Sequence, residues 1–259
     1  MKKAVFFDID GTLWYGAQII PESTKEAVRR LQENGIYTFL CTGRTCVFLN
    51  YPELTELNFD GIVAGCGTYV AVGDEVVVYQ TIEPQIIADT LKILEKYQMP
   101  AVLEGRYKDY MDEGEFKDRG YVNFLKHELG DNLLTITGNE MKWEASKFCA
   151  NFSDLDCSGI VKELESWYNI SSFGSGIECV AKGCTKATGI DVICKKLGIK
   201  KEDTYGFGDS ANDLEMFSYV GCGIAMGNGS DVAKQAADYV TDTIDQDGIF
   251  NACKHFGLI

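Results

Sequence analysis

The sequence predicts an α/β protein, with a parallel sheet at its core and a second, smaller α+β unit inserted into the chain. Apolar runs without alternation occur near both ends of the chain, and such runs are typical of strands that a parallel sheet buries on both faces. Amphipathic helical patterns separate these runs. Between about residues 84 and 180 the pattern changes to short strands among helices. These three observations predict a core made of residues 1–82 and 182–259 and an inserted unit at 83–181.

The first third of the chain alternates strands and helices. Residues 4–7 predict a first buried strand, and residues 20–35 predict a helix that ends on a glycine. Residues 36–41 predict a second buried strand and residues 59–65 a third. Alternating apolar residues between 65 and 81 are typical of a hairpin.

The inserted unit predicts two helices packed on a small, mostly antiparallel sheet. Helical patterns lie at Gln85–Tyr97, Phe116–Glu128 and Cys157–Trp167, and strand patterns at Ala101–Glu104, at Ser146–Ala150 and on both sides of a GSG turn within Ile170–Val180. The unit shows no acid–base cluster of its own. We expect its charged side chains to be solvated and its aromatic side chains to fill its core.

The last part of the chain returns to alternating order. Lys186 lies near the start of an amphipathic helical pattern. Thr204–Phe207 predicts a strand, an acid-rich turn leads into another helix, and residues 222–226 predict a further strand.

The composition narrows the class of protein. A chain of 259 residues with 46% hydrophobic content can bury a full core. Its net charge of -15, with 39 acidic and 24 basic residues, argues against binding to nucleic-acid phosphates. Ten cysteines without a CxxC pair and only two histidines argue against a zinc site. Neither a signal peptide nor a transmembrane segment is predicted, so we expect a cytoplasmic protein; its oligomeric state is left unpredicted.

Two aspartates directly follow the first strand. In FFDIDGTL, residues 6–13, Asp8 and Asp10 lie at the expected carboxyl end of a central strand, where open α/β sheets bind ligands. The alternative is that these acids only begin a turn, because Asp and Gly are common turn formers. From this stretch alone, a site and a turn are equally good interpretations.

Polar residues also follow the second strand and begin the later helix. Thr42, Gly43 and Arg44 place a hydroxyl and a cation beside a flexible turn. Lys186 adds a second cation, although lysines on helices are usually solvated. Each of these signals is weak when taken alone.

The third group of polar residues follows the strand at Thr204–Phe207. Asp209, Asn212 and Asp213 fall within five residues of one another. Asp209 could serve as the N-cap of a helix that begins near Ala211. A cap explains at most one of the three side chains, so a functional role for the others stays open.

Together these stretches resemble the four motifs of the haloacid dehalogenase (HAD) superfamily of phosphatases: DIDGT at 8–12, TGR at 42–44, Lys186, and GDSAND at 208–213. The closing stretch at 223–249, GIAMGNGSDVAKQAADYVTDTIDQDGI, is further similar to the Cof-type subgroup. The resemblance implies a Rossmann-like core with a C2B-type α/β cap inserted after the third strand. Cys66-Gly67-Thr68 departs from the Asn-Gly-Ala-like turn expected in this subgroup.

The resemblance and the chemistry of phosphate esters together assign catalytic roles. Asp8, ionised beside a metal, would attack phosphorus and form an aspartyl-phosphate. Asp10 would give a proton to the leaving oxygen and then act as base for water, so its pKa should be raised. Thr42 and Lys186 would bind the phosphoryl oxygens.

Mg²⁺ is the expected cofactor, because it prefers oxygen ligands, commonly one or two carboxylates with water and phosphate oxygen. Asp8 and Asp209 fit as the carboxylates. The resemblance adds the main-chain carbonyl of Asp10, and Asp213 would hold a bound water or Lys186. The expected substrate-binding residues are Gly43, Arg44 and Asn212.

The sequence thus predicts a Mg²⁺-dependent hydrolase of small phosphate monoesters, either sugar phosphates or phosphorylated cofactors. A phosphomutase that uses the same intermediate and a non-catalytic protein that binds a phosphorylated metabolite are the alternatives. The cap should select the substrate. Its candidate contacts are Glu178, Lys142 and Trp143.

Overall fold

The computed structural model describes residues 2–16, 18–151, 158–173 and 176–259, and the chain divides into two compact units. Unit 1 comprises Met1–Gly43, Asn50–Val78 and Thr185–Ile259, and unit 2 comprises Arg44–Leu49 and Tyr79–Cys184. Among the described residues, no helix has both the length and the apolar character that a membrane span needs.

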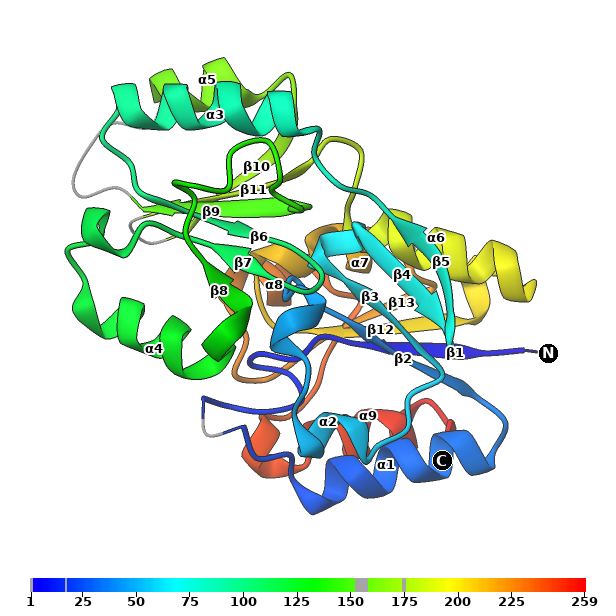
Figure 1. Cartoon of the computed structure of the whole chain (residues 1–259). Helices are drawn as coiled ribbons and strands as arrows, with labels where there is room; N and C mark the ends of the chain where they lie inside the picture. Colours follow the sequence, from blue (N-terminus) through cyan, green and yellow to red (C-terminus); the bar gives the residue numbers. More distant parts are fainter. Residues whose placement is uncertain (1, 17, 152–157, 174–175) are drawn as a thin grey trace. The chain divides into compact units, whose positions relative to one another are not determined.

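Unit 1 is built on an eight-stranded sheet with the order β14-β13-β12-β1-β2-β3-β4-β5 (Figure 1). The pairs from β14 to β3 are parallel, and β3 and β4 are antiparallel. The strands are β1 (Ala4–Phe7), β2 (Tyr37–Cys41), β3 (Gly61–Ala64), β4 (Tyr69–Val72), β5 (Glu75–Tyr79), β12 (Thr204–Gly208), β13 (Cys222–Ala225) and β14 (Tyr239–Val240). The predicted parallel sheet is therefore confirmed.

Helices cover both faces of this sheet, which explains why β1 is apolar without alternation (Figure 1). The helices are α1 (Glu22–Glu33), α2 (Pro52–Thr55), α6 (Lys186–Leu197), α7 (Leu214–Tyr219), α8 (Asp231–Ala236) and α9 (Gly248–His255). Successive residues of a strand point to opposite faces, so Phe6 stacks on Phe39 and Phe7 on Phe207. Burial of each phenylalanine contributes about 2–3 kcal/mol relative to an exposed ring.

Unit 2 is built on a six-stranded sheet with the order β10-β11-β9-β6-β7-β8. Its strands are β6 (Ala101–Glu104), β7 (Asp109–Tyr110), β8 (Leu133–Leu134), β9 (Lys147–Asn151), β10 (Tyr168–Phe173) and β11 (Gly176–Ala181). All neighbours are antiparallel except β7 and β8. The mostly antiparallel sheet was predicted, whereas β7 and β8 were missed because two residues carry no periodicity.

The described residues of unit 2 form three α-helices, where two were expected on the sheet: α3 (Pro84–Lys96), α4 (Arg119–Leu129) and α5 (Ser158–Leu164). α3 and α5 are linked by Glu163, which accepts hydrogen bonds from Lys96 and Tyr97. α4 packs through Val122, Leu125 and Leu129 against Val102 of β6.

Two predicted helix boundaries are corrected in unit 2. The helix expected to start at Phe116 starts at Arg119, because Asp118 caps it by accepting the amide proton of Tyr121 at 3.1 Å. The helix expected to reach Trp167 ends at Leu164. Its expected start, Cys157, and two residues of the GSG turn, 174 and 175, lie outside the described residues.

Candidate active site

Asp8 is the first residue after β1, at the carboxyl end of the central strand. Its amide donates to the carbonyl of Phe207 at 2.9 Å, so the backbone still follows the sheet, and its side chain is only 4% exposed. Asp10, two residues later, is exposed and accepts a hydrogen bond from the Trp14 indole at 3.1 Å. The chain turns at Gly11, where φ is +83°.

Lys186 lies between two carboxylates. Its Nζ donates to Asp8 Oδ1 and to Asp213 Oδ1, both at 2.6 Å, and the side chain is 1% exposed. Lys186 is the first residue of α6, which Thr185 caps by accepting the amide proton of Thr188. The alternative of a solvated lysine is therefore wrong, since this lysine begins a helix that packs its first turn against the sheet.

Asp209 and Asp213 come from the turn after β12. Asp213 is fully buried, and its Oδ2 accepts the amide protons of Asp209 and Ser210 at 2.9 and 3.1 Å. The N-cap of the short helical turn Ala211–Asp213 is Ser210 rather than Asp209. The capping role considered for Asp209 is thus wrong, and its carboxylate is left to the site.

Asp8, Asp209 and Asp213 form a group that could hold a metal ion, with one oxygen of each within 4.8 Å of the others. Three carboxylates are donors of the kind that Mg²⁺ prefers. The side chain of Asp10 does not belong to this group. The residues present therefore fit a hard divalent cation.

The charges in this cluster perturb one another strongly. Burial raises the pKa of Asp8 to about 8, with the Asp213 charge adding to the effect and Lys186 opposing it. Burial and the charge of Asp213 raise the pKa of Asp209 to about 6. Burial disfavours charged Lys186, but Asp213 and Asp8 outweigh it and hold the lysine pKa well above its usual range.

These shifts qualify the expectation that Asp8 is ionised. Three carboxyl groups share one ammonium, so the cluster holds excess negative charge, which adds to burial in raising the pKa of Asp8. A divalent cation would lower both carboxyl pKa values, because an opposite charge at close range favours the ionised form. An ionised Asp8 therefore depends on a bound cation.

The residues after β2 divide between the two units. Thr42 is 1% exposed, and its amide donates to the Val63 carbonyl at 2.8 Å. Gly43 is the last residue of the first segment of unit 1, whereas Arg44 belongs to unit 2, where its Nη1 donates to the Phe48 carbonyl at 3.5 Å. Thr42 and Gly43 thus remain in the unit that carries Asp8.

Asn212 lies beside the lysine. Its Oδ1 is 3.4 Å from Lys186 Nζ and accepts from Ser210 Oγ at 3.0 Å. Of the predicted site residues, Asp8, Lys186, Asn212, Asp209 and Asp213 are brought together by direct contacts or short ligand distances in unit 1.

The chain matches the haloacid dehalogenase-like hydrolase family over residues 5–253. The chain belongs to this family. YkrA of Bacillus subtilis (strain 168) is 32% identical over 262 residues, which cover 100% of this chain and 99% of the relative. The 5-amino-6-(5-phospho-D-ribitylamino)uracil phosphatase YitU of the same organism is 28% identical over 270 residues, which cover 97% and 96%. The solved structure of the HAD subclass IIB sugar phosphatase BT4131 is 31% identical, with 100% of both chains covered and a TM-score of 0.84.

Membership confirms three predictions. The protein is an enzyme, a HAD-like phosphatase of the Cof type. Its fold is the α/β fold of that family with a second α+β unit. The roles of individual site residues stay predictions.

Sequence reasoning missed two residues that support this HAD site. Thr12 is fully buried, and its Oγ1 donates to Asp209 Oδ1 at 3.5 Å. Asn228 donates from Nδ2 to the Gly11 carbonyl at 2.7 Å. Both residues lie inside stretches already quoted for the resemblance, but polar residues at loop positions carry no periodic signal that would distinguish them.

Unit 2 buries charges that were expected to be solvated. Lys147 is 3% exposed and pairs with Glu104 at 3.4 Å and with Glu178, while Asp109 beside them is fully buried. Alternation along the strands places Glu104, Lys147 and Glu178 on one face of the sheet. The expectation that unit 2 has no acid–base cluster is therefore wrong.

The candidate contacts in unit 2 fare differently. Trp143 is buried, and its indole donates to the Ile136 carbonyl at 3.1 Å, so it belongs to the core and the expectation of a substrate contact is not supported. Lys142 is exposed, and Glu178 is paired with Lys147.

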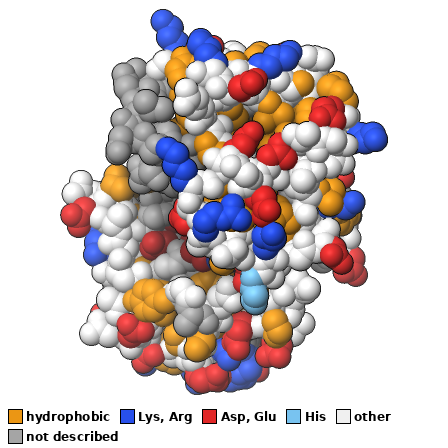
Figure 2. Space-filling model, turned by 60° about the vertical axis from the view of Figure 1, so that its left-hand side comes forward, with side chains coloured by type: hydrophobic (Ala, Val, Ile, Leu, Met, Phe, Trp, Pro, Cys, Tyr) orange, Lys and Arg blue, Asp and Glu red, His pale blue; other side chains and the backbone are white. Residues whose placement is uncertain are grey.

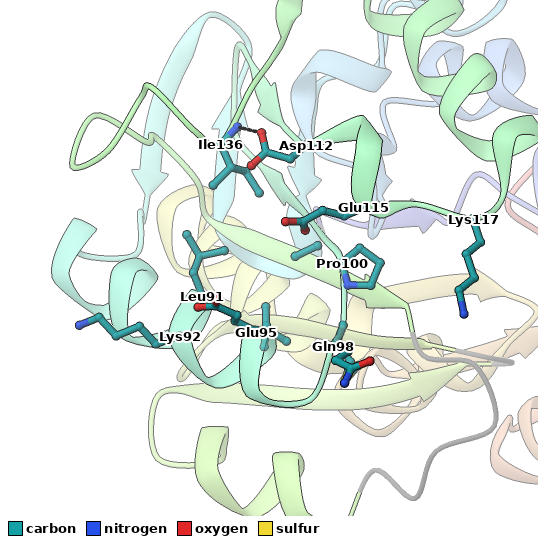
Figure 3. A pocket seen from close by; sticks show the side chains of 12 residues that line it. Leu91, Lys92, Glu95, Gln98, Pro100, Asp112, Glu115, Lys117 and Ile136 are labelled. Atoms are coloured by element: carbon teal, nitrogen blue, oxygen red, sulfur yellow. Dashed lines mark hydrogen bonds between the residues drawn. The ribbon is translucent and has the colours of Figure 1, made fainter.

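Unit 2 also contains a cavity of about 620 Å³ (Figure 3). Buried Leu94 and Met99 and exposed Glu95, Glu115 and Lys117 are among its lining residues. None of the predicted site residues lines this cavity. The carboxylate cluster of unit 1, rather than this cavity, is therefore the candidate active site.

Proposed function

We propose that this HAD phosphatase hydrolyses small phosphate monoesters with Mg²⁺, through an aspartyl-phosphate formed on Asp8. The observation that carries the proposal is the position of Asp8: a buried strand-end carboxylate that touches Lys186 and belongs to a group of three carboxylates. The position of these groups supports the proposal, because the acids follow the carboxyl ends of parallel strands and their oxygens lie close enough together to hold a cation.

In this proposal Asp8, Asp209 and Asp213 hold Mg²⁺, with Asp213 acting directly or through water and Asp10 adding its main-chain carbonyl. When bound, Mg²⁺ supplies positive charge that neutralises the phosphoryl oxygens and the cluster itself. Lys186 and Thr42 donate to the remaining phosphoryl oxygens. Gly43, Arg44 and Asn212 are proposed to contact the substrate.

The first half of the reaction transfers the phosphoryl group to the protein. An Asp8 oxygen forms a bond to phosphorus as the bond between phosphorus and the ester oxygen breaks. Asp10, protonated at this stage, gives its proton to the departing oxygen, so the product leaves as a neutral alcohol.

The second half returns the protein to its starting state. Asp10, now a carboxylate, takes a proton from a water molecule while the water oxygen attacks phosphorus. The bond between phosphorus and the Asp8 oxygen breaks, inorganic phosphate leaves, and Asp10 again carries a proton.

We propose that residues 1–82 and 182–259 form the catalytic core and that residues 83–181 form the unit that selects the substrate. Sugar phosphates are the first expectation and phosphorylated cofactors the second, supported by the activities named for BT4131 and YitU. A net charge of -15 disfavours nucleic-acid substrates, and basic side chains are interspersed with acidic ones on the face drawn in Figure 2.

The test is a panel of phosphorylated metabolites incubated with the protein and Mg²⁺, with released inorganic phosphate as the readout. Rapid-quench samples should contain a phosphorylated protein intermediate. Isomeric phosphate esters in place of inorganic phosphate would indicate a phosphomutase and contradict the proposal.

Asp8→Asn tests the nucleophile, because an amide oxygen cannot displace the ester. Turnover should fall below detection while the protein stays folded. Asp191→Asn is the matched control, since Asp191 lies on α6 and pairs with Lys195 at 2.6 Å. Full activity in Asp8→Asn would refute the assigned nucleophile.

A further inference from the structure

The turn after β13 contacts both acid-bearing loops of the site. This turn, residues 226–230, begins where the Met226 amide donates to the Gly208 carbonyl at 2.9 Å. Ser230 donates to the Asp209 carbonyl from its amide at 2.8 Å and from Oγ at 3.2 Å. Any side chain at Gly229 would meet the same carbonyl at 2.8 Å. The turn is thus packed directly beneath Asp209.

Asn228, at the middle of this turn, spans to the loop that carries Asp10. Its Nδ2 donates to the Gly11 carbonyl at 2.7 Å, and its Oδ1 accepts the amide proton of Ile244 at 3.1 Å. The side chain is half-buried. Both ends of the amide are therefore used, one on the residue next to Asp10 and one on the segment before α9.

The backbone conformation of Gly11 is held by its neighbours as well as by Asn228. Its φ of +83° lies in the region that favours glycine, and a Cβ there would stand 2.4 Å from Asp209 Oδ2. The Gly11 amide donates to the Trp14 carbonyl at 2.9 Å, and the Trp14 indole donates to Asp10 Oδ1. Asn228 holds the next peptide, which joins Gly11 to Thr12, through its carbonyl, so it fixes the orientation of the turn that directly follows Asp10.

We propose that Asn228 is a positioning residue for the proton transfer by Asp10, an inference that rests on the role proposed above for Asp10. Asn228 does not touch the reacting atoms. It keeps the Gly11 turn in the orientation in which the Asp10 carboxyl reaches the ester oxygen.

The chemistry of the leaving group makes this role measurable. An alkyl oxygen leaves as a strongly basic alkoxide unless a proton reaches it, whereas p-nitrophenolate is a weak base and leaves without one. A misplaced proton donor therefore slows alkyl phosphates selectively. Loss of folding or of metal binding would slow both kinds of ester alike.

The experiment compares kcat/KM for p-nitrophenyl phosphate and for the alkyl phosphate that the panel shows to be hydrolysed fastest. kcat/KM reports the steps up to departure of the leaving group, so hydrolysis of the intermediate does not mask the effect. Asn228→Ala removes both hydrogen bonds. Asn228→Asp keeps an acceptor for the Ile244 amide and loses the donor to the Gly11 carbonyl.

Both variants should lose about 10- to 100-fold in kcat/KM on the alkyl ester and less than about 3-fold on the aryl ester. The loss on the alkyl ester is part of the rate enhancement that a general acid usually contributes. Because the two esters are measured on one preparation, any unfolded fraction cancels in their ratio. Asn251→Asp is the matched control: Asn251 donates to Asp242 and Gln246, away from Gly11, and the substitution adds the same charge. The control should leave the ratio unchanged.

Equal losses on both esters, or no loss on either, would overturn the positioning role and leave the proposed function standing. A change in the ratio caused by Asn251→Asp would also overturn it, since added charge alone would then explain the effect. Wild-type protein inactive on both esters would overturn the proposed function, and the inference with it.

Discussion

Each of the two units buries a lysine among three carboxyl groups, yet the two clusters differ in what they can do. In unit 1, Lys186 contacts Asp8 and Asp213 at 2.6 Å, with Asp209 nearby. In unit 2, Lys147 pairs with Glu104 at 3.4 Å and with Glu178, and Asp109 lies within the reach of its charge. The residue types are almost the same.

The difference lies in the geometry of the acids: among the described residues, those of unit 1 form a group whose oxygens could hold a cation. In unit 2, burial and the charge of Glu104 raise the pKa of Asp109 well above its usual range. In unit 1, Asp8 and Asp209 have pKa values of about 8 and 6 and join Asp213 in a group whose ligand atoms could hold a cation. A buried ion pair is therefore not by itself a sign of catalysis.

The backbone around each cluster accounts for this contrast. The acids of unit 1 follow the ends of parallel strands, where loops leave room for ligands. The cluster of unit 2 is carried mainly by neighbouring strands β6, β9 and β11, where each residue is flanked by sheet. Variants of both lysines and of Asp109, together with added Mg²⁺, test whether the two clusters differ in this way.

Lys186→Met should have the largest effect. It removes the ammonium that touches Asp8 and Asp213, and loss of a charge aimed at the phosphoryl oxygens should reduce kcat by at least about 10³-fold. Steady-state hydrolysis of p-nitrophenyl phosphate measures the loss. Lys195→Met, an exposed lysine on the same helix, is the control and should stay fully active. A loss of activity below tenfold in Lys186→Met would contradict a catalytic role for the cluster of unit 1.

Lys147→Met should act on stability instead. Breaking a buried pair leaves Glu104 and Glu178 without their cation, which costs about 3–5 kcal/mol in the free energy of unfolding. Hydrogen exchange should show lower protection for the amides of β9 and β11, while β1 and β12 keep theirs. Lys92→Met, which changes an exposed lysine on α3, serves as the control. If Lys147→Met abolished activity with protection intact, the lysine of unit 2 would be functional.

Added Mg²⁺ should move the acid limb of the rate profile to lower pH. Without a cation, Asp8 ionises only as the pH rises through about 8, because burial raises its pKa. Mg²⁺ favours the ionised form, so the nucleophile becomes available at lower pH as the Mg²⁺ concentration increases. Profiles of kcat/KM against pH at several Mg²⁺ concentrations measure this shift. If the acid limb does not move with Mg²⁺ concentration, the ionisation of Asp8 is not the cause of that limb.

Asp109→Asn should have the smallest effect at low pH and a clear signature in its pH dependence. The folded pKa of Asp109 is raised, so the unfolded chain releases this proton first, and the wild-type protein loses stability as the pH rises from about 4 towards the folded pKa. Asparagine cannot ionise, so this part of the pH dependence should vanish. Urea unfolding between pH 4 and 8 measures it. Identical profiles for the two proteins would show that Asp109 is not the group that holds the proton.

Much of unit 1 was predictable because its buried strands are apolar runs and its first helix is amphipathic and followed by a glycine. The apolar run predicted a strand at Ala4–Phe7, which the structure confirms, and the helix predicted over residues 20–35 spans Glu22–Glu33. Short elements such as α2, β7, β8 and β14 were missed, since two to four residues contain no repeat. Helix α4 starts at Arg119 rather than at the expected Phe116, because Asp118 caps it.

The candidate site was predictable as a set of residues but not as a geometry. The resemblance of DIDGT, Lys186 and GDSAND to the HAD motifs predicted that these residues share a site, and the structure places Lys186 beside Asp8 and Asp213. Ser210 rather than Asp209 caps the turn, and Asp213 accepts hydrogen bonds from two backbone amides. Both features depend on backbone angles that the sequence does not show. The same holds for Asn228.

The sequence by itself determined the order of strands and helices and the residues that follow each strand, because periodicity and turn chemistry act over short distances. The tertiary structure alone decided which charges share a site and which are buried without one. The reason is that burial and charge spacing set the pKa values, and both arise only when residues as distant as Asp8 and Lys186 are brought within 2.6 Å. The two lysine clusters have nearly the same residue types, and their places in the fold decide which of them could hold a cation.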